Sequence, residues 1–277
     1  MRCLSTWPRR SERKTEPLRD CRRPNSLRGW GHGKSNEVLT RGAGASGAGF
    51  NQSPGWRYPD TEECVITEAT IRLGEDGSFR MTPKQVLQIR VSLVGIVPVI
   101  WRRIQIPTTH SFWDLHVAIQ DAMGWFDSHL HAFRLPDPRQ GHLVQIGIPD
   151  DEFEAGRRML PGWKIPVEDY LHEVSPVAVY EYDFSDGWIH VVQLEARLLA
   201  RKGVSYPTCL AGERRCPPED CGGLGGYELL LHALADSDHP EHDSLREWVG
   251  GSYDPDGFQA SNVAFDDPKE RLDTIFE

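Results

Sequence analysis

The hydrophobic and polar positions of residues 86–106 predict two adjacent β-strands. The stretch VLQIRVSLVGI alternates with a period of two residues, which is typical of a half-buried strand. The apolar face of this first strand consists of Leu87, Ile89, Val91 and Leu93. Gly95 and Pro98 indicate a turn, and VIWRRIQI, residues 99–106, is expected to return as the second strand.

Arg102 interrupts the pattern of the second strand, because it shares the face of Ile104 and Ile106. A register shift or bulge near the strand end would turn this side chain to solvent. An inward Arg102 would instead need a buried carboxylate partner, since an unpaired buried charge is costly. Both interpretations fit the sequence.

A helix is predicted next, over residues 111–124 of the segment SFWDLHVAIQDAMGW. Its apolar residues recur every three or four positions, which is the period of an amphipathic helix. Ser111 and Asp114 resemble a capping box with Asp in place of Glu or Gln, and Gly124 is a natural end. The folded part therefore opens with strand, turn, strand and helix.

The rest of the chain predicts more strands and then helices. Short strands are expected at 129–135 and 142–147, and a strand pair at 177–184 and 188–200 around a turn at 185–187. Between them we expect a polar loop and a short helix, at 150–164 and 166–174. After Pro207 the pattern changes to three helical segments, at 224–236, 240–251 and 267–276.

The predicted fold class is α+β. An antiparallel sheet forms from the ββα opening unit and the later β-hairpin, and the C-terminal helices pack on it. Residues 83–277 are expected to form this domain, after a linker at 61–82. Residues 1–60 are rich in Arg, Pro, Ser and Gly and predict a disordered basic tail. A start codon downstream of this tail is the alternative.

Charge divides the chain into a basic start and an acidic body. Residues 1–60 carry twelve Arg/Lys and five Asp/Glu, a net charge of +7, whereas residues 61–277 carry nineteen and thirty-six, a net charge of −17. The acidic body repels nucleic acid, which favours a protein or small-molecule partner. The basic tail could contact nucleic acid or fold back onto the body. We expect a cytoplasmic protein without a membrane span, because neither a signal-peptide core nor a long apolar run is present.

The unusual stretch CPPEDCGGLGGY, residues 216–227, contains Cys216 and Cys221, and Cys209 precedes it. Cys216 and Cys221 are separated by four residues, which is the upper end of the usual zinc-ligand spacing. A zinc site here would take its ligands from Cys209, Cys216, Cys221 and either His232 or His190. Buried packing of the thiols and redox pairing are the alternatives.

The glycines of the same stretch precede a predicted helix, where a glycine loop can cradle phosphate. Glu219 and Asp220 would oppose a phosphate, but they suit the positive end of a helix dipole. We therefore favour a rigid turn stiffened by Pro217 and Pro218, with Asp220 capping nearby N–H groups.

A second group of polar residues follows the predicted strands. His129 and His131 are two residues apart, a spacing that aims both side chains to one face of a strand. Asp183 and His190 flank the turn that contains Asp186, and two histidines with a carboxylate suit a metal ion. Alternatively, His190 is a core residue and Asp186 only forms the turn. The candidate polar cleft consists of Arg102, His129, His131, Asp183, Asp186 and His190.

Four blocks in this order carry a resemblance to a known family: PVIWRRIQIP, GWFDSHLHAF, YEYDFSDGWIH and CLAGERRCPPEDCGGLGGYE. Together they resemble the plasmid pRiA4b ORF-3-like family, over residues 83–272. Its members are also labelled passenger proteins of insertion elements. The resemblance implies a compact α+β domain with a poorly defined biochemical function. We see no residue set of a serine resolvase or tyrosine recombinase, so we take the label as genomic context.

Two functions from different classes follow from these observations. We favour a binding or accessory module, with a link to insertion-sequence or plasmid biology, because no catalytic set is recognised. The alternative is a metal-dependent hydrolase that uses His129, His131, Asp183 and His190, or the group of Cys209, Cys216 and Cys221.

Overall fold

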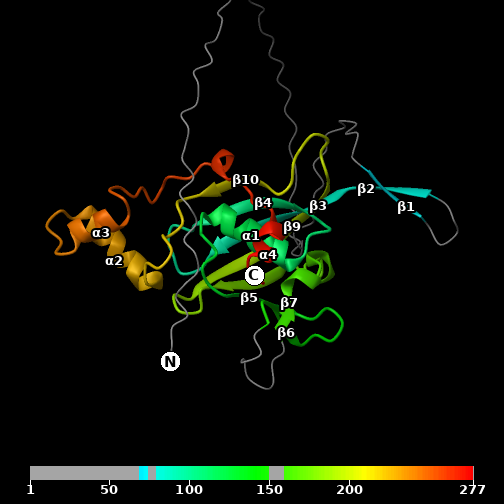
Figure 1. Ribbon diagram of the computed structural model, residues 1–277, viewed down its shortest axis with the longest axis horizontal. Coiled ribbons are helices and arrows are strands. Elements are labelled where there is room, and N and C mark those ends of the chain that lie inside the picture. The colour runs from blue at the N-terminus through cyan, green and yellow to red at the C-terminus, as the bar shows by residue number, and fades with distance from the viewer. Residues whose placement is uncertain (1–68, 74–78, 150–158, 277) are drawn as a thin grey trace, which may run out of the picture. The chain divides into compact units, whose positions relative to one another are not determined.

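The computed structural model describes residues 69–73, 79–149 and 159–276 (Figure 1). The tail expected at 1–60 lies outside the described residues. Within the expected linker, β1 (Ala69–Leu73) and β2 (Phe79–Pro83) form an antiparallel pair. No described helix is long and apolar enough to cross a membrane.

An eight-stranded sheet is the framework of the domain (Figure 1). Its order is β10-β4-β3-β9-β8-β5-β6-β7, and every pair is antiparallel except β6 with β7. The strands are β3 (Gln85–Leu93), β4 (Trp101–Pro107), β5 (His131–Pro136), β6 (Leu143–Gly147), β7 (Met159–Pro161), β8 (Val177–Tyr182), β9 (Trp188–Leu199) and β10 (Thr208–Glu213). With the helices described below, this confirms the α+β class.

The predicted apolar face of β3 is buried, and α1 (Phe112–Met123) packs in the same core. The Ser111 side chain accepts from Asp114 N–H, and the Asp114 carboxylate accepts from Ser111 N–H, so the predicted capping box is present. Gly124 ends the helix in the left-handed conformation, with φ 85°. The sequence located both ends of this helix, because these capping signals involve neighbouring residues and do not depend on tertiary packing.

The C-terminal helices pack in different places. They are α2 (Gly223–Ala235), α3 (His242–Trp248) and α4 (Pro268–Asp273). In α2, Tyr227 and Leu230 join the main core. In contrast, α4 lies against α1, where Trp113 Nε1 donates to the Pro268 carbonyl at 2.7 Å.

Other segments differ from the sequence-based expectation in detail. Short 3-10 turns occur at η1 (Gly162–Lys164), η2 (Val167–Asp169) and η3 (Ala260–Asn262). The helix expected at 166–174 is therefore limited to η2. Strand β10 was not predicted, because TCLAGE has no clear alternation and is broken by a bulge between Cys209 and Ala211.

Arg102 points into the core and is only 1% exposed. The β3–β4 register is continuous and sets Arg102 opposite Val91, so a bulge in β4 is excluded. The carboxylate expected for an inward Arg102 is replaced, within the described chain, by three carbonyl oxygens. The guanidinium donates to the carbonyls of Ala122 at 2.8 Å, Trp101 at 2.8 Å and Glu213 at 2.9 Å.

These contacts let Arg102 serve as the C-terminal cap of α1. The last carbonyls of a helix lack partners within the helix and carry partial negative charge. Ala122 lies in the last turn of α1, which has no basic residue of its own. The Phe258 ring covers the guanidinium at 3.6 Å, and burial lowers the pKa of Arg102. The guanidinium of Arg102 in β4 therefore supplies a hydrogen-bond donor for a carbonyl at the C-terminal end of α1.

We predict that Arg102→Met lowers the free energy of unfolding by about 3–5 kcal/mol, because buried carbonyls lose their donor. Arg103→Met is the matched control. Arg103 forms a half-exposed pair with Glu195, so its loss should cost only about 1 kcal/mol. Urea denaturation measures both values, and equal costs would contradict the proposed role of Arg102.

Candidate metal centre

Three segments that are distant in sequence meet beside the sheet. They are the α1–β5 loop at 124–130, the β8–β9 turn at 183–187 and the stretch at 214–222 before α2. Asp183 N–H donates to the Leu130 carbonyl at 3.0 Å, which joins the loop to the turn. Gly222 N–H donates to Asp186 Oδ2 at 3.1 Å, which joins the turn to the third segment. These are parts of three of the sequence blocks that carry the family resemblance.

The segments bring together His129, Asp183 and Asp220, which we call the carboxylate–histidine cluster. His129 Nε2 lies 2.9 Å from Asp220 Oδ1 and 3.5 Å from Asp183 Oδ2. Each residue offers a ligand atom within 4.8 Å of the other two, and no other His/Cys/Asp/Glu group among the described residues does so. The Asp183 side chain is 5% exposed and that of Asp220 is 69% exposed, so the cluster opens on one side.

The spacing of these atoms fits a metal ion. Zinc binds histidine nitrogen and carboxylate oxygen at about 2.0–2.2 Å, which separates tetrahedral ligand atoms by about 3.4 Å. The two measured separations lie on either side of this value. With a proton on Nε2, His129 donates to Asp220; without it, the same nitrogen lone pair is free for a cation.

The backbone holds both aspartates in left-handed conformations. Asp183 has φ 53° and Asp220 has φ 59°. Asp183 Oδ1 accepts from the N–H groups of Ser185 at 2.9 Å and Asp186 at 3.3 Å, so one oxygen shapes the turn while the other faces His129. Non-glycine residues in this region cost on the order of 1 kcal/mol or more and are enriched at functional sites.

The PPED portion of residues 216–227 includes a turn at Glu219 and Asp220, and its acids reach neighbouring segments. Pro217 accepts from Trp125 Nε1 at 2.9 Å. Glu219 accepts from the Tyr182 hydroxyl and, at 2.7 Å, from Phe126 N–H, and burial raises its pKa. Asp220 was expected to cap N–H groups, but its carboxylate contacts His129. The carboxylate of Asp186 instead accepts a hydrogen bond from the Gly222 N–H.

The cysteines do not join the cluster. Cys216 is buried, and Cys209 and Cys221 are half-buried. Burial raises the pKa of Cys216 and of Cys221 to about 12 and also raises that of Cys209, so these thiols stay protonated at neutral pH. Among the described residues the three thiols also form no group of neighbouring ligand atoms, which supports the packing interpretation.

His131 and His190 also remain outside the cluster, in the aromatic core. Strand β5 begins at His131, so His129 belongs to the preceding loop and the two side chains do not share a face. His131 stacks on His116 with ring centroids 3.5 Å apart, and neither of its ring nitrogens has a hydrogen-bond partner. His190 is fully buried beside Trp125 and Tyr180, as the core interpretation expected.

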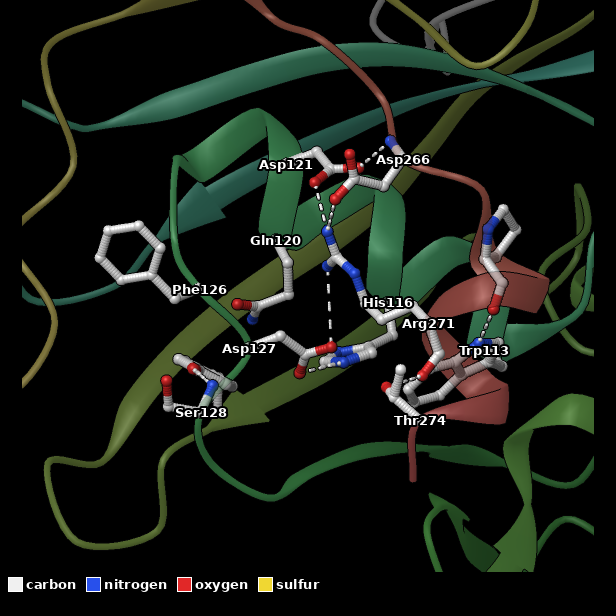
Figure 2. A network of polar contacts seen from close by, with 12 residues as sticks. Trp113, His116, Gln120, Asp121, Phe126, Asp127, Ser128, Asp266, Arg271 and Thr274 are labelled. Atoms are coloured by element: carbon white, nitrogen blue, oxygen red, sulfur yellow. Dashed lines mark hydrogen bonds and ion pairs between the residues drawn. The ribbon is translucent and has the colours of Figure 1, made fainter. Parts of the chain in front are cut away.

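A buried polar network lies behind the α1–β5 loop and was not predicted (Figure 2). His116 Nε2 lies 2.7 Å from Asp127 Oδ1, and its Nδ1 lies 2.9 Å from the Tyr180 hydroxyl. Figure 2 shows Arg271 of α4 extending between Asp127, at 3.6 Å, and Asp121, at 2.7 Å. This network fixes the loop two residues before His129.

Charge complementarity outweighs burial at Asp127 and Arg271, whereas at Asp121 burial dominates and raises the pKa. Burial alone would raise the pKa of Asp127, but the His116 ring and Arg271 outweigh it and lower the pKa. The pKa of Arg271 is raised: Asp121, Asp266 and Asp127 together outweigh the opposing effect of burial. The available sequence signal was the pair His116 and Gln120, which lie four residues apart and therefore share one side of α1.

We predict that Gly223→Ala destabilises the protein by at least about 2 kcal/mol. Gly223 has φ +68°, and an added Cβ would lie 2.5 Å from the Asp186 carbonyl oxygen. Gly225→Ala is the control in the same helix, because its Cβ would meet nothing within 4 Å. It should stabilise by about 0.5–1 kcal/mol, as Ala is the better helix former. Thermal melts of both variants check the contrast.

We also predict that stability falls as pH decreases from about 6.5, the pKa of an unfolded histidine. Burial lowers the pKa of His190 to about 4, and lowers that of His131 well below its usual value. Below pH 6.5 the histidines are protonated in the unfolded chain but stay neutral in the native chain. For His190 this lowers the free energy of unfolding by on the order of 3 kcal/mol at pH 4.

Urea denaturation at several pH values across this range measures the free energy of unfolding. Its dependence on pH should be weaker for His131→Phe than for the parent chain. The exposed control His142→Phe should match the parent chain, and identical profiles for all three proteins would refute the prediction.

Comparison with known proteins supports the family resemblance. The family model of the plasmid pRiA4b ORF-3-like protein matches residues 85–262. The uncharacterized protein y4hQ of Sinorhizobium fredii is 36% identical over 186 residues, which cover 66% of this chain and 91% of that protein. A crystal structure of MM3350, a protein of unknown function from Methanosarcina mazei Go1, has 41% identity and a TM-score of 0.62, covering 66% of this chain and 100% of its own. The chain therefore belongs to the plasmid pRiA4b ORF-3-like protein family.

Proposed function

We propose that this protein is a binding module for a divalent cation, with His129, Asp183 and Asp220 as the ligands. One observation carries the proposal: three separate segments each deliver one ligand atom, and these atoms lie within 4.8 Å of one another. The two aspartates adopt left-handed backbone conformations, which the surrounding hydrogen bonds maintain.

The ligand types select among metals. One imidazole and two carboxylates suit zinc, manganese or ferrous iron, and the absence of a thiol in the cluster disfavours copper(I). The zinc expected from the cysteine spacing is thus proposed at a nitrogen and oxygen site. Three protein ligands also leave coordination positions open, so the bound ion can accept a further ligand.

We predict that the full-length chain binds one zinc ion and that His129→Ala weakens this binding at least 10-fold. Asp183→Asn should weaken it similarly while preserving the turn, because Asn tolerates positive φ and keeps one side-chain oxygen as an acceptor. Competition with a chromophoric chelator measures the affinity. At zinc concentrations near 100 times Kd, binding should stabilise the parent chain by about 2.7 kcal/mol.

His142→Ala is the matched control for these variants. His142 is an exposed histidine in the β5–β6 connection, away from the cluster in sequence and outside the ligand group. Its removal should leave zinc affinity unchanged. Stoichiometric zinc binding that survives in a His129→Ala/Asp220→Asn variant would refute the proposed ligands, and no binding by the parent chain would refute the function.

Metal-assisted hydrolysis is the second candidate. The open side of the cluster, where Asp220 is 69% exposed, favours it because a metal-bound water there could meet a substrate. Hydrolysis of p-nitrophenyl acetate or p-nitrophenyl phosphate by the zinc-loaded chain would support this class if His129→Ala abolished it. We prefer the binding function because it requires only the ligand geometry. A link to mobile elements stays a prediction.

A further inference from the structure

An uncharged loop connects β3 with β4 and exposes apolar side chains. Residues 91–101, VSLVGIVPVIW, contain no charged side chain, although residues 61–277 carry a net charge of −17. Val94, Val97 and Val99 are 44%, 91% and 43% exposed. Apolar residues that are exposed together mark interaction sites more often than single ones do.

This loop continues onto α2. An added Cβ on Gly95 would lie 2.6 Å from Leu224 Cδ1, so the Leu224 side chain rests directly on the loop. Leu224 is itself 43% exposed. We call Val94, Val97, Val99 and Leu224 the apolar patch.

The apolar patch is connected to the carboxylate–histidine cluster through the β8–β9 turn. Leu224 follows Gly223, which touches the Asp186 carbonyl in the β8–β9 turn. From the other side, Val94 N–H donates to the Ile189 carbonyl at 2.8 Å, just after the same turn. Asp183 begins this turn. The turn at 183–187 therefore links a proposed metal ligand to the segments that carry the apolar patch.

Charge decides which partner fits this combination. Without a bound cation, the two carboxylates of the cluster repel an anion. With a divalent cation bound, their two negative charges are neutralised. The open coordination positions then attract an anionic oxygen. The acidic body disfavours nucleic acid and anionic membranes, whereas a polypeptide can present a carboxylate beside apolar side chains.

We propose that the cluster and the apolar patch together dock a polypeptide segment that carries apolar side chains next to a carboxylate. The carboxylate completes the coordination of the bound cation, and the apolar side chains cover the patch. This inference rests on the proposed cation binding. It makes docking dependent on the metal.

Fluorescence anisotropy with labelled peptides tests the inference on the full-length chain. The probe is Leu-Leu-Gly-Gly-Asp-amide, and its controls are Ser-Ser-Gly-Gly-Asp-amide and Leu-Leu-Gly-Gly-Asn-amide. We expect the probe to bind the zinc-loaded chain at least 10-fold tighter than either control, and at least 10-fold tighter than it binds the zinc-free chain. A 10-fold difference corresponds to about 1.4 kcal/mol, close to the burial of two methylene groups.

Two variants separate the patch from the metal ligands. Val97→Ser/Leu224→Ser should remove the preference for Leu over Ser while zinc affinity stays unchanged. Leu143→Ser, at a 61% exposed position in β6, should change neither property. Normal zinc binding without peptide discrimination would overturn this inference alone. Equal binding with and without zinc would overturn the metal dependence, and failure to bind zinc would overturn the proposed function as well.

Discussion

The buried guanidinium of Arg102 holds together the two segments on which the candidate site depends. It donates to the carbonyl of Ala122 at the end of α1 and to that of Glu213 at the end of β10. The chain leaving α1 leads to His129, and the chain leaving β10 leads to Asp220. Desolvating this charge is expensive, and the negative end of the helix dipole offsets part of that cost. One cation on β4, the strand beside the edge strand β10, thus fixes where both ligand segments begin.

Around this anchor, the ligands are supplied by turns while the strands supply rigidity. Asp127, Asp183 and Asp220 all have positive φ, and each bonds a group from another segment: His116, Leu130 and His129. A single regular strand or helix does not bring His129, Asp183 and Asp220 together, because they come from three separate segments. Strain at the three aspartates persists because the neighbouring segments determine the backbone.

The sequence predicted what depends on local patterns and failed where distant segments decide. The β3 alternation, the Ser111 cap and the Gly124 stop were identified because each involves neighbouring residues. His129 and Asp183 were among the residues singled out, and the structure brings them together, but the same reasoning also selected His131 and His190, which are buried in the aromatic core. Asp220 was assigned to a helix cap, since nothing local indicates a bond to a histidine 91 residues away. The carbonyl partners of Arg102 were missed for the same reason.

Burial separates the histidines of this site into two physical classes. His131 and His190 are surrounded by aromatic rings, so desolvation lowers the pKa of each and keeps them neutral. The His129 side chain, in contrast, is 29% exposed and its Nε2 faces the carboxylates of Asp183 and Asp220. An imidazole nitrogen beside two carboxylate oxygens is a set of ligand types that suits a divalent cation. The same carboxylates that disfavour an anionic partner in the cation-free state would hold the cation that attracts a partner carboxylate, beside the uncharged surface of the β3–β4 loop. Cation binding and recognition of a partner are therefore two consequences of one arrangement of charge.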